Sequence, residues 1–290
     1  MDKIKARQIL AAVNLLALLV TAPWVKAADG ESAPEDETCR YLQENLKHKE
    51  FPGGWTYLES VGLLYVPNEC NEQTRCCLYY AGGGGDEDYL YYRGVYYYLE
   101  TYQPNALILF FYGSGFSHKD EVCRQGAEVL LDVAQARGIT LHDMITVGSS
   151  NGAYAALRAS AILYMEYDIP VRRVLILAAG MDWEYPVSEL LSDEQCEAVR
   201  QARTQICLFE RKDVDLRVPA IRRMVHRGVH VTLMACTDWD HNQISVDAYK
   251  NGLFSWGFEE YPRLDPAQYR SIRLWEAPKH RRHDLTALLQ

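Results

Sequence analysis

The chain has 290 residues, of which 48% are hydrophobic and 24% are charged, and its formal net charge is −9 at pH 7. This length and apolar content are enough for one large domain with a substantial core, and there is no repeat or long low-complexity tract. An acidic protein repels the phosphates of nucleic acids and anionic lipid surfaces, so we expect neither as a partner.

The first 27 residues have the layout of a secretory signal peptide. Basic residues near the start precede an apolar run over 9–22, and a small residue, Ala27, follows at a suitable distance. A membrane-spanning helix needs about 20 apolar residues, and this run is shorter. We therefore expect export of the chain and cleavage near Ala27 or Ala28, with membrane association only if the segment is not cleaved.

The polar lead-in over 28–54 is followed by two runs that favour strands, 55–68 and 74–85. A tyrosine-rich stretch of helical length comes next and ends near residue 105. The apolar run over 106–116 has the length of a strand that is buried on both faces of a parallel sheet.

Strands and helices alternate over the rest of the domain. Further strands are expected at "DMITVG", "RRVLILAAG", "QICLFERKD" and "VHVTLMAC", and helices at 117–138, 151–167, 192–204, 217–227 and 242–254. This rhythm predicts an α/β fold, with a mostly parallel sheet flanked by helices. The domain is expected to span 55–262, with a C-terminal tail over 263–290.

A Gly-Ser-Ser-Asn-Gly segment lies where the strand "MITVG" ends and a helix of small residues begins. The segment fits the pattern G-x-S-x-G, with Ser150 between Gly148 and Gly152. In this context the serine occupies a sharp turn at the carboxyl edge of the sheet, and the glycines make room for that turn. The pattern predicts that Ser150 is a nucleophile, whereas an ordinary turn with an N-capping serine is the simpler alternative.

A nucleophilic serine needs a general base and a carboxylate that orients the base. Asp213 follows the strand "QICLFERKD", and His241 follows "VHVTLMAC", so both strands deliver them to the edge where Ser150 lies. We expect Asp213 as the acid and His241 as the base. Asp215 and Glu210 are rivals for the acid, although Glu210 is expected to lie within the strand.

The strand order, the serine turn and the order Ser-Asp-His resemble the α/β-hydrolase fold over about residues 55–260. The resemblance implies an oxyanion hole at the glycine run after "CLYYA", where Ala81 replaces the histidine of a frequent His-Gly-Gly-Gly motif. Its donors would be the N–H groups of Asn151 and Gly83, with Gly84 as a close second. The segment 113–115 is a rival for the glycine run.

The implied function is acyl transfer by a serine esterase, with no metal or cofactor needed. The segment 181–191 is too short for a large lid, so a small lid or none is expected. Trp183, Tyr185 and Trp239 lie on loops at the same edge and would line a site for a small-molecule or carbohydrate-linked ester. The alternative is a non-catalytic protein of the same fold that binds a ligand or partner.

All eight cysteines follow the signal segment, and an even number in an exported chain permits disulfide bonds. Their spacing does not indicate a metal site. Disulfide bonding is expected among Cys39, Cys70, Cys76 and Cys77. Cys207 and Cys236 lie in apolar strands, where they would be buried thiols or one cross-strand pair.

We predict that the exported protein begins near residue 28 and contains at least one disulfide bond among the four early cysteines. The export signal and the even number of cysteines are the reasons. Intact-mass measurement before and after reduction and alkylation checks both points. Eight alkylated thiols in protein that never met a reductant would contradict the second.

Overall fold

The computed structural model of the chain describes residues 53–58, 62–67, 69–72, 74–80, 106–111, 120–141, 144–150, 152–177, 190–210, 218–236 and 272–276. Within these ranges the chain forms one nine-stranded sheet and four helices. No helix in the described part of the chain is long and apolar enough to span a membrane.

The strands lie side by side in the order β1-β2-β4-β3-β5-β6-β7-β8-β9. Their bounds are β1 Gly53–Leu58, β2 Gly62–Pro67, β3 Arg75–Tyr80, β4 Ala106–Phe111, β5 Met144–Ser149, β6 Val171–Leu177, β7 Gln205–Glu210, β8 His230–Cys236 and β9 Ile272–Glu276. The strands from β4 to β8 are parallel, whereas β1, β2 and β9 add antiparallel strands at the two ends. The expectation of a mostly parallel sheet is confirmed.

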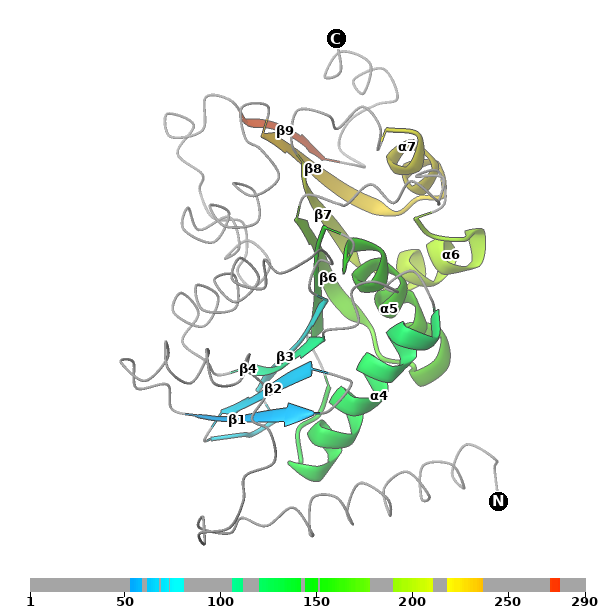
Figure 1. The fold of residues 1–290 in the computed structure, drawn as a ribbon. Coiled ribbons are helices and arrows are strands. Elements are labelled where there is room, and N and C mark those ends of the chain that lie inside the picture. The colour runs from blue at the N-terminus through cyan, green and yellow to red at the C-terminus, as the bar shows by residue number, and fades with distance from the viewer. Residues whose placement is uncertain are drawn as a thin grey trace, which may run out of the picture.

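Four described helices follow strands of the parallel part and lie on one side of the sheet (Figure 1). They are α4 Asp120–Ala136, α5 Gly152–Tyr167, α6 Asp193–Gln201 and α7 Val218–His226. Helix α5 is the central one, because it packs against β5 and β6 as well as against α4 and α6.

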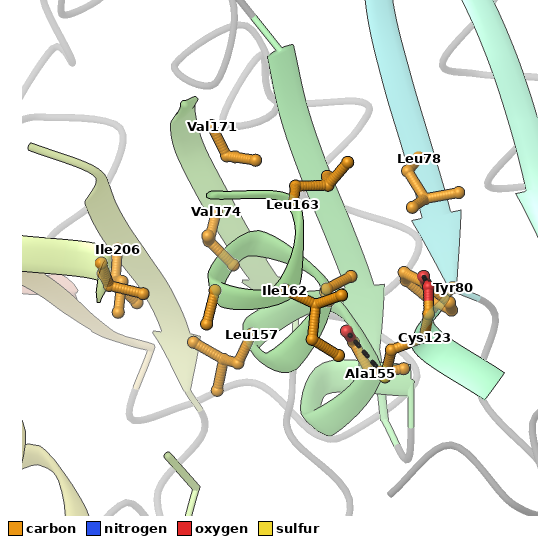
Figure 2. Packing of buried hydrophobic residues seen from close by; sticks show 14 of the residues in the cluster. Leu78, Tyr80, Cys123, Ala155, Leu157, Ile162, Leu163, Val171, Val174 and Ile206 are labelled. Carbon is orange, nitrogen blue, oxygen red and sulfur yellow. Dashed lines mark hydrogen bonds between the residues drawn. The ribbon is translucent and has the colours of Figure 1, made fainter. Parts of the chain in front are cut away.

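Both faces of the parallel strands are buried. On the helix side, residues such as Leu78, Val174 and Ile206 join α5 in one continuous core (Figure 2). The alternate residues of the same strands point to the other face, and Val147 and Leu175 there are also fully buried. Burial on both faces explains why these strands are near-continuous apolar runs in the sequence.

Two features of the sheet differ from the sequence-based expectations. The run over 55–68, expected as one strand, forms the antiparallel pair β1 and β2, in which Leu58 lies opposite Gly62. The polar residues Glu59 and Ser60 interrupt the apolar pattern where the two strands separate. Strand β9 was not expected, and it lies within the segment 263–290 and pairs with β8.

The helices that fall within the described residues agree with expectation to within a few positions. Helix α6 begins with the expected capping box, in which Gln195 N–H donates to Ser192 Oγ over 3.1 Å and Ser192 N–H donates to Gln195 Oε1 over 3.0 Å. Helix α4 ends close to Gly138, which has φ = 67°. The helices expected over 86–105 and 242–254 lie outside the described residues.

Six cysteines are free thiols in this structure: Cys70, Cys76, Cys77, Cys123, Cys196 and Cys207. No disulfide bond joins Cys70, Cys76 and Cys77 to one another, and Cys39 lies outside the described residues, so the disulfide among these four stays a prediction. Cys70 Sγ donates to Pro67 O over 3.4 Å. Burial raises the pKa of the Cys76 thiol to about 12, which keeps it protonated and unreactive.

The alternative of a cross-strand pair between Cys207 and Cys236 is wrong. Cys207 lies opposite Thr232 in the register of β7 and β8, and Cys236 lies four positions further along β8. Four residues of strand span about 13 Å, whereas the Cα atoms of a disulfide lie within about 7 Å.

We predict that Ser192→Ala lowers the free energy of unfolding by about 1 kcal/mol, because Gln195 N–H loses the Ser192 Oγ acceptor while the backbone bond from Ser192 N–H to Gln195 Oε1 is kept. Ser192→Thr keeps the oxygen acceptor and is the matched control. Urea unfolding of both variants checks this. Equal losses in the two variants would show that the hydroxyl does not act as a cap.

Candidate functional site

The turn between β5 and α5 holds Ser150 in a left-handed backbone conformation. Strand β5 ends at Ser149, α5 begins at Gly152, and Ser150 between them has φ = 52°. This conformation costs a residue with a Cβ about 1–2 kcal/mol, and it is uncommon outside turns and functional sites. The chain therefore reverses from strand to helix at one strained residue, which is the geometry that G-x-S-x-G predicts.

Backbone hydrogen bonds hold Ser150 on both sides. Its N–H donates to Leu177 O, the last carbonyl of the neighbouring strand β6, over 2.9 Å. Its carbonyl oxygen accepts from Ala153 N–H, in the first turn of α5, over 3.1 Å. The strained residue is thus tied to the sheet and to the helix, which is how such a conformation persists in a folded protein.

Gly148 is required because the helix passes directly over it. A Cβ atom built on Gly148 would lie 2.4 Å from Gly152 O and 2.7 Å from Ala153 Cα. Both are backbone atoms, so a flexible side chain could not move aside to relieve the overlap. The first glycine of the motif therefore permits the close crossing of β5 and α5 that forms the turn.

Ser150 lies at the carboxyl edge of the parallel strands, in front of the N-terminus of α5. The 16-residue helix places the positive end of its dipole at this turn, a favourable environment for a developing negative charge. Ser150 is 7% exposed, so only a small part of the residue reaches the surface.

The strands that lead to the other expected site residues end at the same edge. Strand β7 ends at Glu210, three positions before Asp213, and β8 ends at Cys236, five positions before His241. The parallel register places Ser149 opposite Leu177, Leu177 opposite Phe209, and Glu210 opposite Ala235. The loops after β7 and β8 thus start level with Ser150.

Most of the predicted site residues themselves lie outside the described residues. These are the acid and base Asp213 and His241, the oxyanion donors Asn151 and Gly83, and the aromatic residues Trp183, Tyr185 and Trp239. The same holds for Asp215, Gly84 and the segment 113–115, and for the expectation of a small lid. Ser150 is the member of the predicted site whose geometry the structure gives.

Glu210, a rival for the catalytic acid, is the last residue of β7, as expected, and is 1% exposed. Ile206 and Leu208 lie four and two positions before it in the strand and belong to the helix-side core. Residues two positions apart in a strand share a face, so Glu210 is directed to the helix side as well. Strand β7 is two positions from β5 in the sheet, a lateral distance of about 10 Å. The sequence indicated its place in the strand but not its nearly complete burial.

Among the residues that the structure describes, no group of three or more histidine, cysteine or acidic side chains is placed to hold a metal ion. The features of the described site are the serine turn, the glycine beneath it and the helix N-terminus in front of it.

Comparison with known proteins identifies the fold. A mutant of the esterase rPPE has a TM-score of 0.50 and is 12% identical, and the match covers 86% of this chain and 95% of that chain. The chain has the α/β-hydrolase fold. No protein-family model matches the sequence, and no curated protein matches it.

Two other esterase structures are similar to this chain. Carboxyl esterase 2 from the mycorrhizal fungus Tuber melanosporum is 16% identical with a TM-score of 0.47, over 86% of this chain and 94% of that chain. Carboxylesterase CesB from Bacillus subtilis is 10% identical with a TM-score of 0.48, over 78% of this chain and 98% of that chain.

We predict that Gly148→Ala lowers the free energy of unfolding by about 3 kcal/mol, because its Cβ meets backbone atoms that cannot move separately. Gly138→Ala is the matched control. Gly138 has a positive φ, unlike Gly148, but its Cβ would meet no atom within 4 Å, so only about 1 kcal/mol of backbone strain is expected.

Denaturant unfolding of the two glycine variants, side by side, gives the comparison. If Gly148→Ala does not accumulate as folded protein while Gly138→Ala does, the result also supports a larger loss of stability in Gly148→Ala. Similar stabilities would show that β5 and α5 can separate at this turn without cost.

Proposed function

We propose that this chain is an exported serine hydrolase that cleaves carboxylic ester bonds. The observation that carries the proposal is the left-handed conformation of Ser150 between β5 and α5, over a glycine that leaves no room for a Cβ. An α/β-hydrolase fold with a nucleophile elbow at this turn is a scaffold for acyl transfer. The esterases among similar solved structures support the same reaction class.

In the proposed mechanism Ser150 Oγ attacks the carbonyl carbon of the ester. His241 accepts the hydroxyl proton and then donates it to the leaving alcohol, while Asp213 orients the imidazole and stabilises its cation. The N–H groups of Asn151 and Gly83 stabilise the oxyanion, each contributing about 3 kcal/mol to the lowering of the barrier. Water then attacks the acyl-enzyme while His241 takes its proton; the bond to Ser150 Oγ breaks, His241 returns the proton to that oxygen, and the carboxylic acid leaves.

The substrate class we propose is a small-molecule or carbohydrate-linked ester. Aromatic side chains pack well against sugar rings and aryl groups, and Trp183, Tyr185 and Trp239 follow β6 and β8, whose carboxyl ends lie at the edge that holds Ser150. Export through the segment 1–27 is part of the proposal and places the reaction outside the cytoplasm.

We predict that Ser150→Ala abolishes turnover of a small activated ester and prevents labelling by a fluorophosphonate, while the protein stays folded. Ser149→Ala is the control, since Ser149 is the last residue of β5 and is 1% exposed. Its turnover is expected to stay within about tenfold of wild type, because an elbow exposes only its central residue.

Circular dichroism and thermal unfolding confirm that both serine variants are folded before their kinetics are compared. Unchanged turnover in folded Ser150→Ala would overturn the nucleophile assignment. A wild-type protein that neither turns over esters nor reacts with the fluorophosphonate would favour the non-catalytic binding protein instead.

The acid is tested by a second pair of variants. We predict that Asp213→Asn lowers the rate by about 10⁴-fold, because an amide misorients the imidazole tautomer, and that Asp215→Asn has a much smaller effect. Steady-state kinetics of both variants under identical conditions check this. A severe loss of rate in Asp215→Asn alone would show that Asp215 is the catalytic acid. A severe loss only in Glu210→Gln would show that the acid is Glu210, the buried last residue of β7.

A further inference from the structure

A chain of hydrogen bonds joins the end of β3 to α4 and α5. The Tyr80 hydroxyl donates to Cys123 O over 3.1 Å, and the Cys123 thiol donates to Ala155 O over 3.5 Å. Figure 2 shows the three residues close together, with Tyr80 and Cys123 beside the first turns of α5 that carry Ala155. The partners are 43 and 32 positions apart in the sequence, so these bonds fix three separate elements relative to one another.

The whole chain of bonds is buried. Tyr80 is 1% exposed, and Cys123 and Ala155 are fully buried. Burial raises the pKa of Tyr80 well above its usual value and that of Cys123 to about 12, so both groups keep the proton that they donate. Hydrogen bonds in such a dry environment have little competition from water and hold their geometry.

Helix α4 has a glycine, Gly126, at the point where the Tyr80 hydroxyl lies against it. A Cβ built on Gly126 would lie 2.8 Å from Tyr80 Oη, closer than such contacts occur in proteins. Glycine within a helix is less favourable than alanine by about 1 kcal/mol, so this position is not explained by helix formation. It is explained by the space that the hydroxyl needs to reach Cys123 O.

The position of Tyr80 connects this chain of bonds to the proposed reaction. Tyr80 is the last residue of β3, lies opposite Gly148 of β5, and immediately precedes the run over 81–85 that contains Gly83. Ala155 is the fourth residue of α5, the helix that follows Ser150 and Asn151. The bonds thus tie together β3 and α5, the two described elements that adjoin the proposed oxyanion donors in the sequence.

We propose that Tyr80 is a positioning residue that fixes the C-terminal end of β3 relative to the N-terminal turns of α5. This proposal rests on the proposed function, because this placement matters for catalysis only if the residues that follow β3 and precede α5 donate to one oxyanion. An oxyanion hole stabilises the transition state more than the bound ester, so a loosened hole lowers kcat and leaves KM nearly unchanged.

The first test is Tyr80→Phe, which removes the hydroxyl and keeps the ring. We expect a decrease in kcat of about tenfold for a small activated ester, with KM within about twofold of wild type, and a similar decrease in the rate of fluorophosphonate labelling. The matched control is Thr204→Val. It also removes one buried hydrogen bond from a side chain to a backbone carbonyl, Thr204 Oγ1 to Val171 O at 2.7 Å, but at the opposite edge of the sheet.

The second test uses Gly126→Ala, which leaves Tyr80 unchanged but displaces its hydroxyl. We expect the single variant to lower kcat as Tyr80→Phe does. In the double variant Tyr80→Phe/Gly126→Ala the ring has no oxygen to displace, so its kcat should equal that of Tyr80→Phe alone. Independent effects, in which the two losses multiply, would contradict the proposed chain of contacts.

The outcomes separate the two proposals. If wild type is active and Tyr80→Phe loses no more activity than Thr204→Val, then the positioning role is wrong and the hydrolase function stands. If wild type is inactive toward esters and fluorophosphonates, the proposed function fails and the positioning role fails with it. A tenfold loss of kcat in Tyr80→Phe, with kcat retained in Thr204→Val and no further loss in the double variant, supports both.

Discussion

The close crossing of β5 and α5 is the constraint on which the rest of the structure depends. Gly148 brings the two backbones into contact, and the chain can make so short a turn only if Ser150 adopts a positive φ. The turn places the helix N-terminus directly in front of the strand. A longer loop would relieve the strain, but it would also move the serine away from the helix dipole and from the edge where β7 and β8 end.

Small side chains allow α5 to lie this close to the sheet. Ala153, Ala155, Ala156 and Ala159 are all fully buried, and the Thr146 hydroxyl of β5 donates to Ala156 O over 2.9 Å. A helix of larger residues would stand further from β5 and could not receive these contacts. Alanine also has the highest helix propensity, so the same residues favour both the helix and its close approach.

The sequence predicted those parts of the fold whose physical cause is local. Strands buried on both faces are continuous apolar runs, as in 174–177, and the serine turn has glycines at fixed positions. The sequence did not predict strand β9, because IRLWE has two charges in five residues and lacks the apolar run of a buried strand. The strand lies at the end of the described sheet, where it has a neighbouring strand on one side. The hydrogen bonds from Tyr80 to Cys123 and from Cys123 to Ala155 could not be predicted, because they join residues far apart in the chain and no local sequence pattern indicates such partners.

The buried hydrogen bonds from Tyr80 help to maintain the strained backbone at Ser150. A residue in a left-handed conformation costs about 1–3 kcal/mol and persists only where its surroundings over-determine it. Here the backbone bonds to Leu177 and Ala153 hold the serine itself, while the bonds through Cys123 hold α5 against β3. If α5 could shift away from β3, Ser150 could relax toward an ordinary turn. The rigidity of the buried helix side of the sheet therefore maintains the strained backbone at the carboxyl edge.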